Sequence, residues 1–136
     1  MKLGIVCARF NEGITKRMKK AALAVARKTK IDVVSVIDVP GAFDIPYAVK
    51  FTLEKKKVDA IAALGAVIKG ETDHDVLIAT VAAERIAKLS LKYGKPITLG
   101  IIGPNATEEQ AGRRAEEYAT RAVEAALALS KLKMQE

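Results

Sequence analysis

Two spacings of apolar residues alternate along the chain. Short hydrophobic runs rich in β-branched residues predict strands at residues 3–8, 32–39, 60–68 and 96–102. The segments between them repeat apolar residues every three or four positions, which is typical of amphipathic helices. Because the strand segments are almost continuously hydrophobic, both faces of the sheet are expected to be covered, as in a parallel sheet.

Signals at the ends of the helical segments support this division. Gly94, with a proline two residues later, predicts the end of the third helix. Residues 107–110 have the pattern of a capping box, and the fourth helix is expected to run from there to about Leu132. Four strand–helix repeats predict a flavodoxin-like α/β fold, a three-layer α/β/α sandwich with a four-stranded parallel sheet, formed as one domain over residues 1–136.

The composition indicates which residue types form the core and where in the cell the protein is expected. Half of the residues are hydrophobic but only 4% are aromatic, so the core is expected to consist of Ala, Val, Ile and Leu. No apolar run approaches the length of a membrane span and no signal-peptide pattern opens the chain, so we expect a cytoplasmic protein without a membrane partner. The single cysteine, Cys7, lies in an apolar run and is interpreted as a small core residue.

The chain is strongly basic, with 23 Lys and Arg against 16 Asp and Glu and a net charge of +7. Such a charge can indicate nucleic-acid binding. The basic residues are spread over helix faces without interleaved aromatics, so no nucleic-acid partner is expected, and the positive field would instead favour anionic small molecules. The chain has no Gly-x-Gly-x-x-Gly loop after the first strand, no Walker loop and no histidine–cysteine cluster, so nicotinamide and metal chemistry are not expected.

Ligands of a parallel sheet bind beyond the carboxyl ends of its strands, and this rule selects four loops. They are residues 8–13, 39–46, 68–75 and 102–110. In the first loop, Phe10 could stack on a planar heterocycle or cap the core. In the second, Asp44 could cap a helix or accept hydrogen bonds from a ligand.

The third loop contains Gly70, Thr72 and the only histidine, His74. Thr72 or Asp73 is a candidate cap for the following helix, whose free N–H groups and dipole suit an anion such as phosphate. His74 would lie in the first helical turn, at the mouth of that site. Because an imidazole can both take and give a proton near neutral pH, we favour a functional role for it over a structural one.

The fourth loop leads into a helix with two adjacent arginines, Arg113 and Arg114, about two turns from its start. Either guanidinium could reach a phosphate held at an adjacent loop. A solvated helix face explains one of the two equally well.

Taken together, the four loops resemble those of the lumazine synthase family, which acts in riboflavin biosynthesis. The matching stretches are ARFN, VPGAFDIP, ALGAVIKGETDHD, and KPITLGIIGPN followed by EEQAGRR. They occur in the family's order and cover nearly the whole chain. The acidic HD and the GPN stretch are similar to the archaeal branch of the family.

The resemblance implies a transferase that condenses 5-amino-6-(D-ribitylamino)uracil with 3,4-dihydroxy-2-butanone 4-phosphate. The products would be 6,7-dimethyl-8-ribityllumazine, phosphate and water, and the reaction requires no cofactor or metal. The resemblance also implies a homo-oligomer, because family members form pentamers with active sites between neighbours, often packed into icosahedral capsids.

The same resemblance implies a set of site residues. His74 matches the catalytic proton-transfer histidine. The residues implied in phosphate binding are Glu71, Thr72 and Arg114. Those implied in substrate binding are Phe10, Ala42, Phe43, Asp44, Ala66, Val67, Ile68 and Leu99. The chain has Asp75 and Leu99 where many bacterial members have aromatic residues, so the second wall of the site is expected to be aliphatic and to come from across a subunit boundary.

The sequence leaves two alternatives open. One is an archaeal-type riboflavin synthase that dismutates two lumazines, although the GETDH loop with its histidine argues against it. The other is a non-catalytic flavin-binding module. That module would need a phosphate-binding loop after the first strand, where RFNEG offers one glycine and an acidic residue.

Overall fold

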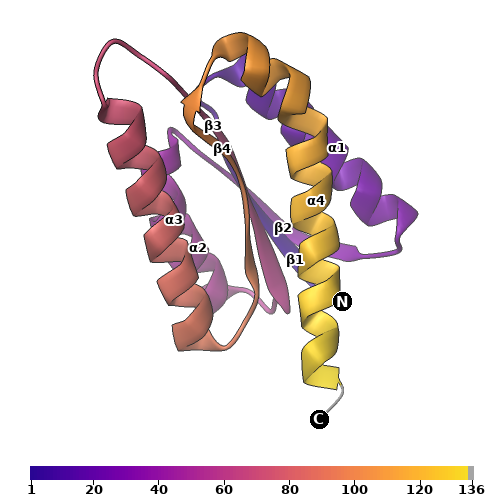
Figure 1. Ribbon diagram of the computed structural model, residues 1–136. Helices are drawn as coiled ribbons and strands as arrows, with labels where there is room; N and C mark the ends of the chain where they lie inside the picture. The colour runs from indigo at the N-terminus through magenta and orange to yellow at the C-terminus, as the bar shows by residue number, and fades with distance from the viewer. Residues whose placement is uncertain (135–136) are drawn as a thin grey trace.

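The computed structural model describes residues 1–134 as four strands, four α-helices and one short 3-10 helix (Figure 1). The strands are β1 (Lys2–Ala8), β2 (Asp32–Val39), β3 (Ala60–Ile68) and β4 (Ile97–Ala106). The helices are α1 (Glu12–Lys28), η1 (Ala42–Asp44), α2 (Ile45–Lys55), α3 (His74–Tyr93) and α4 (Glu108–Met134). The predicted alternation of strands and helices is therefore confirmed.

The strands form one parallel sheet in the order β2-β1-β3-β4. Helices α1 and α4 cover one face of the sheet, and α2 and α3 cover the other (Figure 1). This arrangement confirms the predicted α/β sandwich. Since all strands run in the same direction, their carboxyl ends lie along one edge of the sheet, and the loops that follow them meet there.

Small side chains let α4 pack closely on the sheet. Every alanine at positions 111, 115, 119, 122 and 126 is buried, and together these alanines form one stripe of the helix. Gly100 lies in β4, beneath this helix. A Cβ added there would lie 2.7 Å from Leu64 Cδ2 and 2.9 Å from the Ala63 carbonyl oxygen, so no larger residue fits. Thr98 Oγ1 donates a hydrogen bond of 2.8 Å to the Ala122 carbonyl across the same contact. The core is aliphatic, as its composition predicted.

The predicted helix ends are present. Gly94 follows α3 with a left-handed backbone, φ 64°, and its N–H donates to the Ser90 carbonyl. At the start of α4, Thr107 N–H donates to Gln110 Oε1 at 3.0 Å and Gln110 N–H donates to Thr107 Oγ1 at 3.1 Å. These two bonds form the predicted capping box.

Strand β4 is longer than predicted, because it continues past residue 102 to Ala106. Residues 103–105 were expected in the fourth loop, beyond the end of the strand. Instead Ala106 pairs with Ile68, after a register irregularity between Ala66 and Ile68, and accepts a hydrogen bond of 2.7 Å from Lys69 N–H. Gly103 has φ 113°, which allows the irregular course without leaving the sheet.

No helix within residues 1–134 combines the length and the apolar character needed to cross a lipid bilayer.

We expect Gly103→Ala to lower the free energy of unfolding by about 3 kcal/mol, because an alanine there is strained at this φ and overpacked. Its Cβ would lie 2.5 Å from the Val67 carbonyl oxygen. Gly13→Ala is the matched control, since Gly13 lies in α1 with no atom within 4 Å of the added Cβ. In denaturant unfolding, the free energy of unfolding of Gly13→Ala should equal that of the wild type or exceed it by up to about 1 kcal/mol. Equal stability of the two variants would contradict the packing described at Gly103.

Candidate active site

A pocket of about 320 Å³ lies where the loops after β1, β2 and β3 meet. It therefore occupies the position that the parallel sheet predicts for a ligand. The lining residues are Phe10, Asn11, Gly41, Ala42, Phe43, Ala66, Val67, Ile68, Gly70, Thr72, His74, Asp75 and Ile78. Eight of the twelve predicted site residues are in this set, namely Phe10, Ala42, Phe43, Ala66, Val67, Ile68, Thr72 and His74.

Backbone hydrogen bonds hold the first two loops together. Arg9 N–H donates to the Val39 carbonyl at 2.7 Å, and Phe10 N–H donates to the Pro40 carbonyl at 2.9 Å. Asn11, which precedes α1 with a left-handed backbone, φ 63°, then reaches to β3. Its Nδ2 donates a hydrogen bond of 2.7 Å to the Ala66 carbonyl. Hydrogen bonds thus join three segments that are distant in sequence into one wall of the pocket.

Two phenylalanine rings stand at the pocket without being part of the core. Phe10 is 71% exposed and Phe43 is 60% exposed, although both line the pocket. The interpretation of Phe10 as a cap on the core is therefore wrong. Exposed rings beside a hollow are suited to stacking on a planar ligand.

His74 is the first residue of α3, so its predicted place in the first helical turn is confirmed. Its backbone N–H donates to Thr72 Oγ1 at 3.3 Å, while Asp73, the N-cap residue, makes no side-chain capping bond. The imidazole is exposed and lines the pocket. The imidazole, a side chain able to take and give a proton, thus lies beside the first N–H groups of a helix.

Four predicted site residues lie outside the pocket lining of this chain: Asp44, Glu71, Leu99 and Arg114. Asp44 Oδ2 accepts a hydrogen bond of 3.0 Å from Gly41 N–H, which closes the short η1 turn. Glu71 is exposed in the loop before α3. Leu99 is 53% exposed on the edge strand β4, and Arg114 is exposed on α4.

Close to Arg114 in the sequence, an ion pair between Arg17 and Glu116 forms a clamp that joins α1 to α4. Arg17 donates to Glu116 from Nε at 2.8 Å and from Nη2 at 2.6 Å, and Nη2 also reaches the Gly112 carbonyl at 2.6 Å. The hydrogen bond from Arg17 lowers the pKa of Glu116, so the clamp persists until the pH falls well into the acidic range. Arg113 lies 3.8 Å from Glu109.

Five lining residues are not among the twelve predicted site residues, namely Asn11, Gly41, Gly70, Asp75 and Ile78. Asn11 directly follows Phe10, and its occurrence just before a helix could have marked it as a residue tolerant of the left-handed conformation. Ile78 packs against the core from α3 and also lines the pocket, so its apolar character alone indicates only a core residue. Asp75 is only 5% exposed, and nothing in the local sequence indicates that a carboxylate would be buried there.

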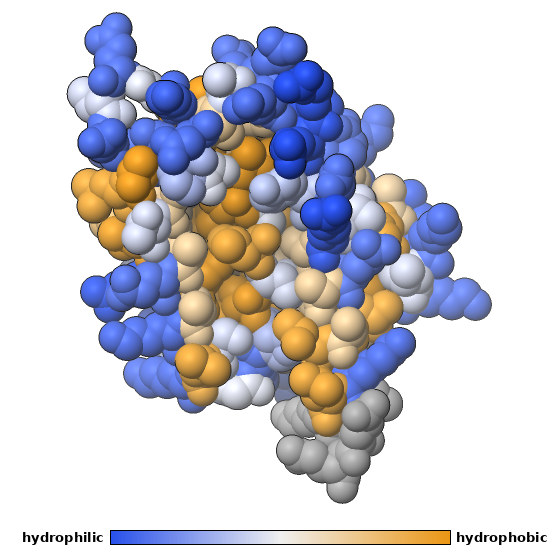
Figure 2. All heavy atoms as spheres, viewed as in Figure 1, coloured by the Kyte–Doolittle hydropathy of each residue, from blue (hydrophilic) through white to orange (hydrophobic). Residues whose placement is uncertain are grey.

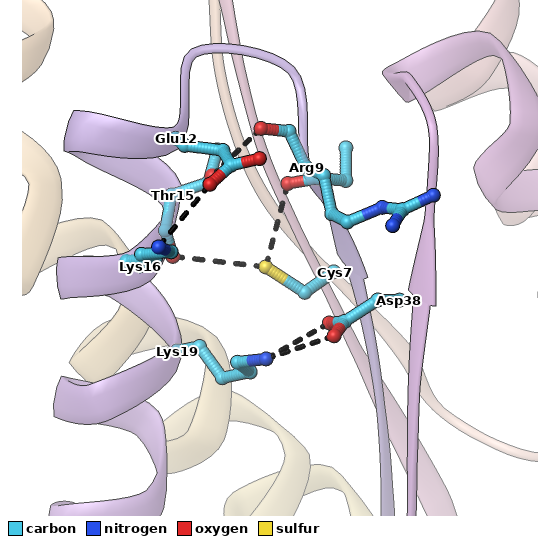
Figure 3. Close-up of polar contacts among 8 residues, drawn as sticks. Cys7, Arg9, Glu12, Thr15, Lys16, Lys19 and Asp38 are labelled. Carbon is cyan, nitrogen blue, oxygen red and sulfur yellow. Dashed lines mark hydrogen bonds and ion pairs between the residues drawn. The ribbon is translucent and has the colours of Figure 1, made fainter.

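A second cluster of polar residues lies between α1 and β2 (Figure 3). Lys19 pairs with Asp38 at 3.0 Å, and Lys16 pairs with Glu12 at 3.2 Å. The buried Cys7 thiol beside them is only weakly hydrogen-bonded, and burial and then the charge of Asp38 raise its pKa to about 11. Such a thiol is a poor nucleophile at neutral pH, which agrees with its interpretation as a core residue.

Within residues 1–134, no group of three or more His, Cys, Asp or Glu side chains is arranged to hold a metal ion.

The fold and the pocket together define a class of protein. It is a parallel α/β sandwich with a pocket of small-molecule size at the strand carboxyl ends, lined by two exposed aromatic rings and one imidazole.

Comparison with known proteins gives the family. The family described as 6,7-dimethyl-8-ribityllumazine synthase matches residues 1–134, and this chain belongs to it. A 6,7-dimethyl-8-ribityllumazine synthase of Saccharolobus solfataricus is 57% identical, over 95% of this chain and 84% of the relative. Proteins of the same name from Metallosphaera sedula and Sulfolobus acidocaldarius are 50% and 49% identical, over 96% and 95% of this chain and 87% and 82% of the relatives. The family predicted from the loops is confirmed.

Proposed function

We propose that this protein condenses 5-amino-6-(D-ribitylamino)uracil with 3,4-dihydroxy-2-butanone 4-phosphate to give 6,7-dimethyl-8-ribityllumazine, phosphate and water. The observation that carries this proposal is the family match over residues 1–134. The two alternatives, a riboflavin synthase and a non-catalytic flavin-binding module, are not favoured, because the relatives carry the name of the lumazine synthase.

The pyrimidine substrate is assigned to the aromatic side of the pocket. Phe10 stacks on the ring, and Ala42, Phe43 and Asp44 line the space for the ring and the ribityl chain. Val67 and Ile68, at the carboxyl end of β3, offer backbone groups to the edge of the pyrimidine. The Ala66 carbonyl contributes less than its position suggests, because it already accepts a hydrogen bond from Asn11.

The phosphate of the second substrate is assigned to the start of α3. Thr72 and the loop at Glu71 lie beside the first N–H groups of this helix, and the helix dipole favours a negative charge there. Most of the positive charge needed to balance the phosphate would come from a guanidinium, and Arg114 is the family's match.

His74 is assigned the proton transfers. The substrate amine attacks the ketone, and imine formation, loss of phosphate and ring closure each move protons. An imidazole held between the phosphate loop and the aromatic rings can take these protons and return them. Holding two substrates together in one pocket contributes to the rate as well.

We also propose that the working form is a homo-oligomer, a pentamer or a shell of pentamers, in the cytoplasm. Leu99 and Arg114 lie away from this chain's own pocket, so a neighbouring copy would have to supply them. Figure 2 shows apolar side chains gathered in the band between α3 and α4, where β4 forms the open edge of the sheet. The exposed leucines of these elements are Leu77, Leu91, Leu99, Leu129 and Leu132. A patch of this kind is typical of a surface covered by another chain.

The purified protein, incubated with both substrates, should form the fluorescent lumazine faster than the spontaneous reaction. Product formation at only the spontaneous rate would contradict the proposed function. Supplying 6,7-dimethyl-8-ribityllumazine alone tests the riboflavin synthase alternative, and formation of riboflavin in that arm would favour it. Tight flavin mononucleotide binding without turnover would favour the binding module.

His74→Ala is expected to slow turnover by about 100-fold, the lower end for general acid–base catalysis, because the two substrates are still held together. Steady-state kinetics measures the change, and light scattering should show the same particle size as the wild type. Thr80→Ala, an exposed residue of the same helix outside the pocket, is the matched control. Wild-type turnover in His74→Ala would remove the role assigned to the imidazole.

Mixed assemblies test whether Arg114 comes from a neighbouring copy. His74→Ala and Arg114→Ala chains, each nearly inactive alone, would be co-expressed in equal amounts. If each site combines His74 of one copy with Arg114 of the next, about one quarter of the sites in a random assembly carry both residues. Activity should therefore recover to about one quarter of wild type. If both residues of a site belong to one chain, mixing restores nothing.

A further inference from the structure

The segment between β3 and α3, residues 69–73, is bound on both sides to neighbouring residues of β4. At its start, Lys69 N–H donates to the Ala106 carbonyl at 2.7 Å. At its end, Asp75 Oδ2 accepts a hydrogen bond of 3.0 Å from Asn105 N–H. The loop that carries Thr72 and precedes His74 is thus closed by two bonds to adjacent peptide groups.

Asp75 differs from the usual acidic residue in a first helical turn. Such a residue is normally exposed and interacts with the N–H groups of its own helix. Asp75 as a residue is only 5% exposed, and its carboxylate instead accepts a hydrogen bond from a residue 30 positions later in the chain. Burial of a carboxylate costs free energy unless the group is hydrogen-bonded. The bond from Asn105 N–H therefore stabilises Asp75 more than the same bond would on the surface.

The partner of Asp75 is held in place by the course of β4. Asn105 has a left-handed backbone, φ 65°, and Gly103 has φ 113° and packs against the Val67 carbonyl. Ala106 remains paired with Ile68. The end of β4 therefore presents one N–H to α3 and one carbonyl to Lys69 from a segment of fixed shape.

We propose that Asp75 is a positioning residue, which acts through its bond to Asn105 N–H to set the first turn of α3, and with it Thr72 and His74, relative to the end of β3. What these groups are positioned for rests on the proposed function. The aromatic side of the pocket does not depend on this bond, because the links from Phe10 to Pro40 and from Asn11 to Ala66 hold it separately. Loss of Asp75 should therefore affect the phosphate-bearing substrate more than the pyrimidine.

Hydrogen exchange of the wild-type protein tests the bond directly, whatever reaction the protein catalyses. Asn105 is an exposed residue whose N–H donates to Asp75 Oδ2, so protection of this amide from exchange reports on that bond. In Asp75→Ala the amides of Asn105 and His74 should exchange roughly 10- to 100-fold faster, while those of central β3 stay unchanged. Asp73→Ala removes the same charge two residues away, at a side chain without a capping bond, and should leave the Asn105 amide as protected as before. An unprotected Asn105 amide in the wild type would overturn the proposal.

Kinetics separates positioning from a contact with the substrate. Asp75→Ala should raise KM for the butanone phosphate about tenfold while KM for the pyrimidine changes less than about threefold. Asp75→Asn keeps an oxygen acceptor for Asn105 N–H and should restore both values to within about threefold of wild type. If Asp75→Asn is as impaired as Asp75→Ala, or if both KM values rise together, the charge or the whole pocket is responsible and the proposal fails. Absence of turnover in the wild type would instead speak against the proposed function and leave the exchange result to decide the role of Asp75.

Discussion

The parallel direction of the four strands is the constraint on which the rest of the structure depends. It brings the carboxyl ends of β1, β2 and β3 to one edge of the sheet, where the loops from three separate parts of the chain enclose a single pocket. No loop could form this pocket alone. The aromatic rings come after β1 and β2, and the imidazole comes after β3, so these side chains line one pocket only when the strands pair in register.

Much of the fold and part of the site could be predicted because they depend on local sequence. Continuous apolar runs identify the strands, and Gly94 and the Thr107–Gln110 box identify helix ends through bonds made within a few residues. Phe10, Thr72 and His74 could be named because each follows a recognisable strand. These are predictions that need the topology but no detailed packing.

The parts that escaped prediction depend on contacts between distant residues. Asp75 appears in the sequence as an ordinary acidic residue at a helix start, and only its partner 30 residues later accounts for its burial. The extension of β4 through Gly103 could not be predicted, because a Gly-Pro-Asn sequence is typical of a turn. Pairing with the end of β3 keeps this segment in the sheet. The places of Leu99 and Arg114, away from the pocket of their own chain, could not be read from spacing either.

The exposed rings have a thermodynamic consequence. All three phenylalanines of the chain, Phe10, Phe43 and Phe51, are at least 44% exposed, while the core is filled by alanine and branched aliphatic side chains. Most of the surface of Phe10 and Phe43 is therefore hydrated in the free chain and does not stabilise the fold. Water released from Phe10 and Phe43 when a flat ligand covers them would give association a negative heat-capacity change. In Phe10 and Phe43, apolar surface that does not contribute to folding is available for binding.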